Sequence, residues 1–540
     1  MSEPAGRAPQ RVDAKVLIGG EWYQKDDRLE SLNPATGEII GYAPLCNKED
    51  VGLAVLAARE AQSSWAALPL DRRIGHLETL RGLVAQEGDA LASLITQESG
   101  KPLQEAHFLE ILGTLDLITG LCKGAPAYLD DRRVGGGNPL PWGRRHWIRR
   151  VPLGVLGVIS PWNLPLAIPM GQILPALLAG NTVVFKPSEL APLVGTKLAG
   201  LLHRAGFPPG VLNLVTGGPE TGAHLVEGGL DGLLFTGSTA VGLQIQAKLA
   251  PRLIPTGLTL GRKDAFLVLP DAPFARTVNG AAWAACFGTG QACASAERFF
   301  VPIQMKERFA AAVAAKVGAL RVGNGMEEGV EVGPLISSHQ LERVEVHVQE
   351  AVWKGARLLC GGRRLPGPGF FFQPTVLVDV PMDCALMREE TLGPVVPVVG
   401  YADLDEAVRW INDSRYGLSA SIWTADVERG LALGRRLAVG SVWINDVSYS
   451  HTQARFPWGG MRQFGTGRAH GLGLLHELTS MQLLGADRGQ REGEPWWFPY
   501  SSDGLDLARR MRFLLAEGLA GRLINLIPFF KDLVKVRGTR

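Results

Sequence analysis

The chain has 540 residues, of which 46% are hydrophobic and 20% charged. This is the balance of a globular protein with two or three domains, and it excludes a largely disordered chain. The net charge of +2 provides no field that would attract nucleic acid, so we expect no nucleic-acid partner. The six cysteines lack metal-ligand spacing and the polar N-terminus lacks a secretory signal, which predicts a cytoplasmic protein without a metal site.

The first 150 residues change pattern twice. Short apolar runs such as Val16–Ile18, broken by glycine and proline, predict small strands before residue 50. Apolar residues then recur at three- and four-residue spacing from Lys48 to about Cys122, which predicts helices. Residues 144–151 alternate basic and apolar side chains, as an exposed strand does.

Residues 151–185 contain no charged side chain and are long enough to cross a bilayer. Five prolines interrupt this run, and prolines at that density break a helix repeatedly. Buried parallel strands joined by a helix give a similarly continuous apolar run. We therefore interpret the segment as part of an α/β core.

From Val155 onward, predicted strands and helices alternate, which indicates βαβ units and a mostly parallel sheet. A second α/β region is expected from about residue 265 to residue 467. The predicted fold class is therefore α/β, in which ligands bind beyond the carboxyl ends of the strands.

Three predicted strand ends carry residues suited to a nucleotide. Lys186 and Glu189 are spaced to hold the two hydroxyls of a ribose, and the carboxylate disfavours the 2′-phosphate of NADP. Gly237 and Ser238 open a predicted helix whose N-terminal N–H groups would bind a diphosphate. A glycine-rich turn contains Gly217. Together these segments predict an NAD site, with NADP less favoured.

Cys293 lies among small residues shortly after Gly288 and Gly290, which allow a tight bend. A helix beginning near Ala294 would direct its positive end at the sulfur and lower the pKa of the thiol. A lone cysteine is more often a small core residue. Beside a nucleotide site, however, a nucleophile is the better interpretation.

The order of these segments resembles the aldehyde dehydrogenase superfamily over roughly residues 15 to 485. The resemblance is carried by PWNLP at 161–165, KPSE at 186–189, FTGS at 235–238, GQACASAER at 290–298, EETLGP at 389–394, and PWGG at 457–460 with Gly467-Arg468. It implies a Rossmann-type parallel-sheet cofactor domain, an α/β catalytic domain and oligomerisation strands. The implied bounds are 1–138 and 152–258 for the NAD-binding domain, 259–467 for the catalytic domain, 139–151 and 478–490 for oligomerisation, and 491–540 for a C-terminal extension.

The resemblance also implies NAD(P)-dependent oxidation of an aldehyde to a carboxylic acid. Cys293 would form a thiohemiacetal and, after hydride transfer, a thioester, while Asn163 and the Cys293 backbone N–H would stabilise the oxyanion. Glu390 would hold the nicotinamide ribose. The other implied cofactor-binding residues are Trp162, Lys186, Ser188, Glu189, Gly217, Gly237 and Ser238. A homo-oligomer, dimer or tetramer, is implied as well.

Two of the departures from the family pattern bear directly on the chemistry. Thr259 stands where the family has the glutamate that activates water for thioester hydrolysis, and threonine accepts no proton at neutral pH. Losing a general base costs about 10²- to 10⁴-fold in rate. Arg262 replaces a glycine beside the nicotinamide and substrate. It would either obstruct the nicotinamide pocket or bind an acidic substrate or phosphate.

Three interpretations follow from these departures. In the first, another group or a bound water replaces the missing base. In the second, a thiol such as coenzyme A accepts the acyl group in a CoA-acylating enzyme. In the third, the chain is a catalytically degenerate member that acts as a binding or scaffold protein. Because the other expected catalytic and cofactor residues are retained, an enzyme is favoured.

The C-terminal extension is basic and amphipathic. Residues 505–540 hold eight basic and three acidic side chains, and six apolar residues fall on helical spacing: Leu507, Met511, Leu514, Leu515, Leu519 and Leu523. Such a helix would lie on an anionic membrane surface as a peripheral contact, or would pack on a neighbouring subunit. The subunit contact is slightly favoured.

Overall fold

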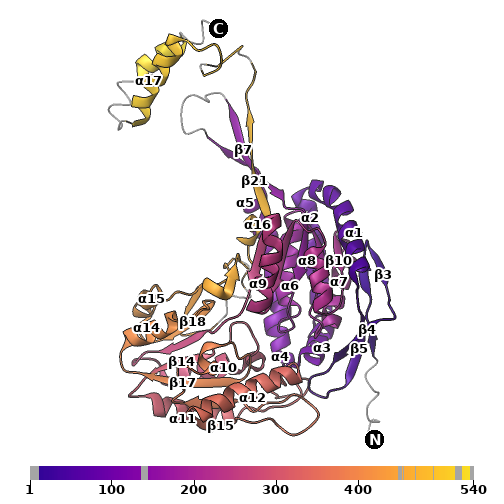
Figure 1. The fold of residues 1–540 in the computed structure, drawn as a ribbon, viewed down its shortest axis with the longest axis vertical. Coiled ribbons are helices and arrows are strands. Elements are labelled where there is room, and N and C mark those ends of the chain that lie inside the picture. Colours follow the sequence, from indigo (N-terminus) through magenta and orange to yellow (C-terminus); the bar gives the residue numbers. More distant parts are fainter. Residues whose placement is uncertain are drawn as a thin grey trace. The chain divides into compact units, whose positions relative to one another are not determined.

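The computed structural model describes residues 11–135, 144–447, 453, 455–468, 470–489, 492–494, 496–516 and 526–534. The chain forms two compact units (Figure 1). The first unit extends to Leu129 and resumes from Val151 to Ser480, and the second comprises Asp130–Arg150 and the chain from Met481 onward.

An eight-stranded sheet organises the amino-terminal half of the first unit, in the order β20-β12-β11-β8-β9-β10-β2-β3. Its five central strands are parallel and alternate with helices along the chain. These elements are β8 (Val155–Ile159), α6 (Ala167–Leu178), β9 (Thr182–Lys186), α7 (Pro192–Arg204), β10 (Leu212–Leu214), α8 (Pro219–Glu227), β11 (Gly232–Thr236), α9 (Thr239–Leu249) and β12 (Thr256–Thr259). Because β9 follows β8 on one side and β11 lies on the other, the strand order reverses between β8 and β11.

Antiparallel strands and N-terminal helices complete this domain. The strands β2 (Val16–Ile18), β3 (Glu21–Tyr23) and β20 (Gly465–Thr466) flank the parallel set. A small separate sheet consists of β1 (Val12–Asp13), β4 (Arg28–Leu32) and β5 (Ile39–Pro44). The helices of this part are α1 (Lys48–Ala67), α2 (Leu70–Gln86), α3 (Gly88–Ser99), α4 (Leu103–Glu105), the π-helix η1 (Ala106–Ile111) and α5 (Leu112–Leu129).

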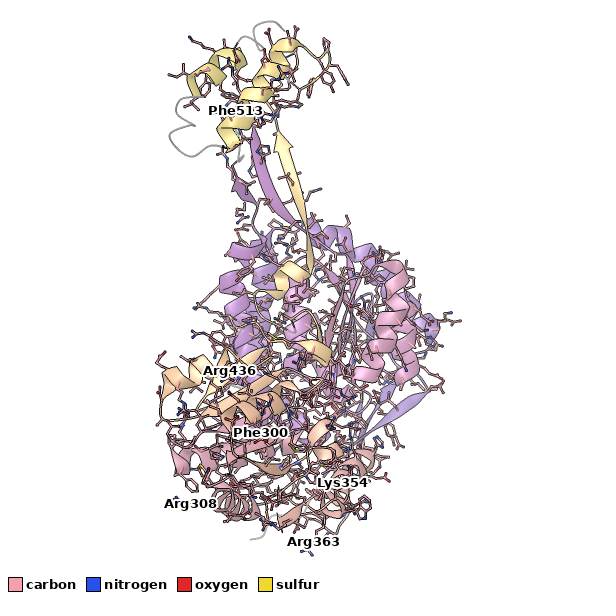
Figure 2. All side chains as sticks on the ribbon, turned by 60° about the vertical axis from the view of Figure 1, so that its left-hand side comes forward. Phe300, Arg308, Lys354, Arg363, Arg436 and Phe513 are labelled. Atoms are coloured by element: carbon pink, nitrogen blue, oxygen red, sulfur yellow. The ribbon has the colours of Figure 1, made fainter. Side chains whose placement is uncertain are left out.

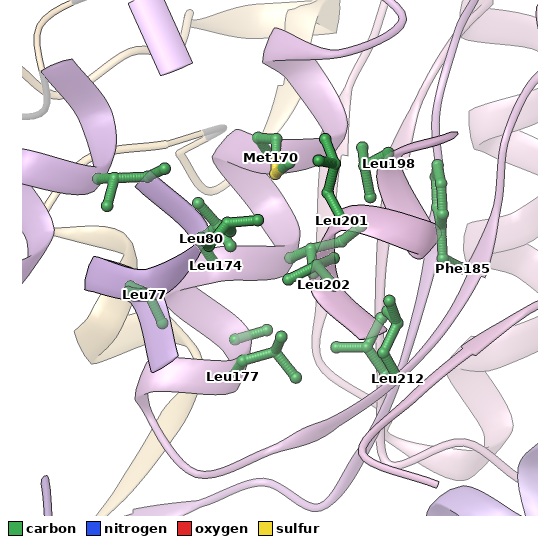
Figure 3. Close-up of a cluster of buried hydrophobic side chains, with 14 of the residues drawn as sticks. Leu77, Leu80, Met170, Leu174, Leu177, Phe185, Leu198, Leu201, Leu202 and Leu212 are labelled. Atoms are coloured by element: carbon green, nitrogen blue, oxygen red, sulfur yellow. The ribbon is translucent and has the colours of Figure 1, made fainter. Parts of the chain in front are cut away.

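Apolar side chains on both faces of the sheet form two cores. One face packs against leucines of α2, α6 and α7, with Phe185 and Leu212 contributed by the strands (Figure 3). The opposite face packs against α1, α8 and α9. This two-sided burial explains the uncharged run at 151–185, and among the described residues no helix is long and apolar enough to cross a membrane.

A seven-stranded sheet forms the core of the second half, in the order β15-β16-β17-β14-β13-β18-β19. Along β13, Ala265 and Leu267 face one core while Phe266 and Val268 face the other. Figure 2 shows Phe300 of β14 inside this half, with Arg308 and Arg363 at its outer edge. Its strands are β13 (Ala265–Val268), β14 (Arg298–Pro302), β15 (Arg357–Cys360), β16 (Thr375–Val378), β17 (Val395–Tyr401), β18 (Ser419–Trp423) and β19 (Ser441–Ile444). Its main helices are α10 (Phe274–Cys286), α11 (Lys306–Gly318), α12 (Ser338–Trp353), α14 (Leu404–Asn412) and α15 (Val427–Gly434).

The predicted α/β class and the strand–helix alternation are confirmed. One predicted domain bound does not match the sheets: Gly465–Thr466, placed in the catalytic domain from sequence, pairs through β20 with β12 of the first sheet. The reason is that this short strand returns from the second half and adds an antiparallel edge. The segment near 144–151 is a strand as predicted, β7 (Arg145–Pro152).

The second unit contains a three-stranded sheet and part of the C-terminal extension. The sheet has the order β21-β7-β6, with β6 (Arg132–Val134) and β21 (Thr479–Ala486) on either side of β7. In the extension, α17 (Ser502–Ala516) is followed by a helix at 526–534. Leu507, Met511 and Leu514 of α17 are buried against Phe529 and Leu533.

Half of the predicted apolar stripe of the extension is therefore covered by the chain itself. Three of its six residues form this small core, while Leu515 is exposed and Leu519 and Leu523 lie outside the described residues. Arg510 also forms an ion pair with Asp532 of the second helix. A stripe buried in this way leaves less apolar surface for a membrane or a second subunit than the sequence alone indicates.

We predict that Phe529→Asp unfolds this helix pair without unfolding the first unit. Phe529 is fully buried in a core of five residues, and truncating a buried Phe typically costs about 3 to 5 kcal/mol. Hydrogen exchange should show that residues 502–516 lose protection while the strands of the two large sheets keep theirs. Phe513→Asp, at a position that is 45% exposed, is the matched control and should leave protection in place. Protection of 502–516 retained in Phe529→Asp would refute the helix pair.

Candidate active site

A cleft of about 340 Å³ opens at the carboxyl ends of β8, β9 and β11, where the strand order reverses. Its walls include the segment from Ile159 to Trp162 after β8, Lys186 at the end of β9, and Phe235 to Gly237 at the end of β11. An open parallel sheet binds nucleotides at this position, because the loops after neighbouring strands diverge there.

Five of the predicted cofactor residues line this cleft: Trp162, Lys186, Ser188, Glu189 and Gly237. The Lys186 ammonium is buried and lies 3.8 Å from the Glu189 carboxylate, with its Nζ donating to the Pro187 carbonyl at 3.1 Å. Burial lowers the pKa of Lys186, and Glu189 opposes that shift. These two side chains are thus adjacent at the end of β9, as the ribose prediction requires.

The other three predicted cofactor residues do not line the cleft. Ser238 is the N-cap of α9, and its hydroxyl accepts a hydrogen bond from Val241 N at 3.3 Å. Gly217 has φ of +150°, and a Cβ there would lie 2.1 Å from the Thr221 hydroxyl, so the turn before α8 requires glycine. Glu390 lies instead among the charged residues around Arg262, described below.

The loop that carries Cys293 bends as predicted. Gly288, Thr289 and Gly290 have φ of 58°, 59° and 70°, and a Cβ on Gly290 would lie 2.1 Å from the Gly393 carbonyl oxygen. The left-handed conformation is easy for glycine and strained for Thr289. The loop is therefore pressed closely against the segment near Gly393.

The helix predicted to begin near Ala294 is absent. Residues 291–297 form turns and extended chain leading into β14. Their backbone groups pair with distant segments instead: Ala296 N donates to Ala284 O at 2.9 Å, and Glu297 N donates to Asp264 O at 3.0 Å. Tertiary hydrogen bonds thus override the helix preference of the alanines, and no helix dipole acts on the sulfur.

The environment of Cys293 raises rather than lowers the pKa of its thiol. Burial is the largest influence and brings the pKa to about 11. Arg262 lowers it, while Asp264 and Glu390 raise it further. Cys293 and Leu109 pack beside an apolar cluster of Phe287, Ala292, Ala294, Leu418, Trp458 and Phe464.

The Asn163 amide reaches the same loop. Its Nδ2 donates to Gln291 O at 2.9 Å, two residues before Cys293, and its Oδ1 accepts from Leu164 N at 3.1 Å. The predicted oxyanion donor and the predicted nucleophile are therefore brought together by β8 and the loop before β14.

A buried ion pair behind Asn163 was not predicted. Lys101 bonds to Glu110 and donates from Nζ to Asn163 O at 2.7 Å. Glu110 accepts from Leu166 N and Ala167 N, each at 2.9 Å, and so caps the start of α6. The signal in the sequence is a single carboxylate between Leu109 and Ile111, because a charge in an apolar helical stretch requires a buried partner.

Thr259 ends β12, and its side chain is buried, with 8% of the residue exposed. Its backbone carbonyl accepts from Gly237 N at 3.0 Å, which ties it to the cofactor cleft. Of the carboxylates, Asp264 and Glu390 are the ones that influence Cys293 electrostatically. Burial raises the pKa of each to about 7.

Arg262 is buried among carboxylates and carbonyl oxygens. It lies 3.4 Å from Glu297 Oε1 and 3.8 Å from Glu390 Oε1, and it donates to the carbonyls of Gly290 and Ser295. Burial alone would lower the pKa of Arg262, but Glu297, Asp264 and Glu390 raise it above its ordinary value. The charge of Arg262 is thus balanced by carboxylates of the protein itself, and its contact with an acidic substrate or phosphate stays a prediction.

A second cavity of about 570 Å³ lies beside the nucleophile loop. Its walls include Leu109, Cys286 and Phe287, together with Trp283, whose ring stacks on that of Phe287 at 4.4 Å. Glu105 also lines it and accepts from Gly288 N at 2.8 Å. One of its wall residues, Phe287, is also a member of the apolar cluster against which Cys293 and Leu109 pack.

Comparison with known proteins agrees with this geometry. A sequence profile of the aldehyde dehydrogenase family matches residues 22–484. The chain is 35% identical over 478 residues to the geranial dehydrogenase of Castellaniella defragrans, covering 87% of this chain and 98% of that protein. It is 34% identical to the betaine aldehyde dehydrogenase of Rhizobium leguminosarum, covering 87% of this chain and 96% of that one. The NAD+ complex of the Bacillus cereus aldehyde dehydrogenase is similar with a TM-score of 0.84 at 33% identity, covering 88% and 97% of the two chains.

The fold is thus that of an α/β protein with a cleft at the switch point of its parallel sheet and a cysteine loop near it. The chain belongs to the aldehyde dehydrogenase family, as the resemblance implied. The expectation that it is an enzyme of this class is confirmed.

We predict that alkylation of Cys293 by iodoacetamide in the cofactor-free protein speeds up about tenfold per pH unit between pH 7 and 9. The thiolate is the reactive form, and its fraction rises tenfold per unit while the pH remains below the pKa of about 11. Mass spectrometry of the peptide carrying Cys293 measures the rate separately from the other cysteines. Urea-unfolded protein is the control and should level off near the ordinary thiol pKa of about 8.5. A plateau below pH 9 in the folded protein would contradict the prediction.

Proposed function

We propose that this protein oxidises an aldehyde with NAD through a thioester on Cys293. The observation that supports this most directly is the Asn163 amide, bonded at 2.9 Å to the loop that carries Cys293. Beside it lies a nucleotide-sized cleft at the switch point of a parallel sheet. The similarity to an NAD+-bound structure supports NAD as the cofactor.

The residues that line the cleft suit the adenosine end of a dinucleotide. Lys186 and Glu189 are placed to hold the adenosine ribose, and the negative charge of Glu189 disfavours the 2′-phosphate of NADP. Gly237 and Ser238 place the start of α9 where a diphosphate meets free N–H groups. Trp162 would line the same cleft, the turn at Gly217 would border it, and Glu390 would hold the second ribose. Bound NAD would supply the acceptor for the hydride that leaves the substrate carbon.

The remaining chemistry belongs to the chain. The Cys293 sulfur would add to the aldehyde carbon, and the Asn163 amide with the Cys293 N–H would stabilise the oxyanion. After the hydride leaves, the acyl group remains on Cys293 as a thioester. The cavity lined by Trp283, Phe287 and Leu109 would hold an apolar substrate chain, because aromatic and aliphatic walls gain from excluding water.

Release of the acyl group is the step that Thr259 alters. Without the family glutamate, hydrolysis would be slow, or would depend on water activated by another group. A CoA-acylating reaction is the alternative, since a thiolate attacks a thioester without a base. A binding or scaffold role is the third candidate, favoured if Arg262 closes the nicotinamide side of the cleft.

We further propose a cytoplasmic homo-oligomer. All six cysteines are free, as in a reducing compartment. Strand β21 is a sheet edge with exposed Met481 and Leu483, which suits pairing with another subunit. A peripheral membrane contact through the extension is the alternative to this subunit contact: three residues of its apolar stripe are buried, while Leu515 and Ile527 are exposed.

We predict a burst of NADH near one equivalent per Cys293 when the protein is mixed rapidly with NAD and an apolar aldehyde, followed by a slow phase. Absorbance at 340 nm reports both phases. Thr259→Glu should accelerate the slow phase by about 10²-fold or more, because it restores a general base. Thr259→Gln, which has the same shape without the base, is the matched control and should not.

The outcomes separate the three candidates. If coenzyme A accelerates the slow phase of the unmodified protein, the acceptor is a thiol. If no aldehyde gives a burst and calorimetry detects no NAD binding, the scaffold role replaces the proposed enzyme. Equal slow phases in the Glu and Gln variants would contradict the role assigned to position 259.

A further inference from the structure

Arg262 bridges both sides of the nucleophile in the described structure. One terminal nitrogen of its guanidinium bonds to Ser295 O, and the other donates to Gly290 O at 3.3 Å. These carbonyls lie two residues after and three residues before Cys293. Only 1% of Arg262 is exposed, so water competes little for these hydrogen bonds.

The same side chain extends to Glu390. Arg262 Nε lies 3.8 Å from Glu390 Oε1 and has no hydrogen-bond partner among the described residues, so this nitrogen faces the carboxylate alone. Arg262 also lies 3.4 Å from Glu297 Oε1, but the closer ion pair of Glu297 is with Lys263, whose Nζ lies 2.6 Å from Glu297 Oε2. Arg343 and Lys263 also act on Glu390 electrostatically, and Arg262 is the cation that contacts both the Cys293 loop and Glu390.

The charged groups that act on Cys293 are Arg262, Asp264 and Glu390. Two of them are carboxylates, which oppose formation of a thiolate. Arg262 is the one that favours it. In a loop where the predicted helix is absent, Arg262 is the cation with the largest effect on the Cys293 thiol.

We propose that Arg262 is a positioning residue that fixes the Cys293 loop against Glu390 and supplies the positive charge beside which the Cys293 thiolate forms. This inference rests on the proposed function of Cys293 as the nucleophile. It assigns Arg262 a role in place of the obstruction or the acidic-substrate contact that its sequence position indicated.

An arginine suits this role better than a lysine because of its shape. The planar guanidinium presents several N–H groups in fixed directions, so it contacts two carbonyls and two carboxylates at once. A lysine would keep the charge but would not bridge Gly290 and Ser295 together. The two properties, charge and bridging, are therefore separable by substitution.

The test is the rate of Cys293 alkylation by iodoacetamide at pH 8 and pH 9, without NAD or aldehyde. Arg262→Met removes the charge at similar length, and the rate should fall at least about threefold at both pH values. Each unit of rise in the thiol pKa lowers the thiolate fraction tenfold, partly offset by the higher nucleophilicity of a more basic thiolate. Arg262→Lys should stay within about twofold of the unmodified rate.

Glu390→Gln supplies a second variant with the opposite sign. Removing this carboxylate should raise the alkylation rate by about threefold, and adding Arg262→Met to it should lower the rate again. Arg73→Met is the matched control, because Arg73 is another buried arginine, in α2, and its guanidinium donates a hydrogen bond to Ala66 O. That control should leave the Cys293 rate unchanged.

Hydrogen exchange reports the bridging separately. Exchange in residues 288–297 should rise in both Arg262→Met and Arg262→Lys, because neither side chain spans the two carbonyls. A rate in Arg262→Met equal to the unmodified rate, in protein shown by circular dichroism to be folded, would overturn the proposal. If Arg262→Met does not fold, an alkylation rate for Arg262→Lys more than tenfold below the unmodified rate would overturn it. Because the alkylation assay uses neither NAD nor aldehyde, its result does not depend on whether the protein oxidises aldehydes.

Discussion

The buried carboxylate of Glu297 joins the three segments on which the site depends. It accepts from Lys263 at 2.6 Å, from Thr391 N at 3.0 Å and from Leu392 N at 2.9 Å, and lies 3.4 Å from Arg262. Burial alone would raise the pKa of Glu297, but Lys263 and Arg262 hold it at about 2. Removing one partner of such a buried pair typically costs about 3 to 5 kcal/mol, because the other charge is left uncompensated. The segment after β12, the entry to β14 and the loop of Glu390 are thus held in one arrangement.

The residues proposed for cofactor binding and catalysis lie in loops at the ends of strands of the two sheets. Parallel strands end at the same edge of a sheet, so the residues after β8, β9 and β11 converge on one cleft. Asn163 follows β8 and Cys293 precedes β14, and a single hydrogen bond connects their loops. The Cys293 loop before the second sheet is therefore bonded to the segment that leaves the first sheet. An aldehyde needs access to both a nucleophile and a hydride acceptor at such a position.

The fold was predictable because its signals are local. The strand at 232–236 and the helix from Thr239 to Leu249 follow the predicted strand–helix alternation, since an apolar run and the Ser238 cap mark them clearly. Residues 291–297 were mispredicted as the start of a helix because their backbone partners, Ala284 and Asp264, are distant in sequence. The contacts of Arg262 and the Lys101–Glu110 pair could not be predicted for the same reason: a charge in an apolar context indicates burial, but not which partner it finds. The roles of Cys293, Asn163 and Thr259 remain predictions.

The central claim is that Cys293 carries the acyl group during turnover, and intact-protein mass spectrometry after rapid acid quenching tests it most directly. Protein mixed with NAD and an apolar aldehyde should gain the mass of one acyl group, and peptide mapping should place that mass on Cys293. We expect the acyl adduct to accumulate, because hydrolysis of the thioester is slow when Thr259 provides no general base. NADH formation without a covalent adduct at any quench time, or an adduct on another cysteine, would contradict the account.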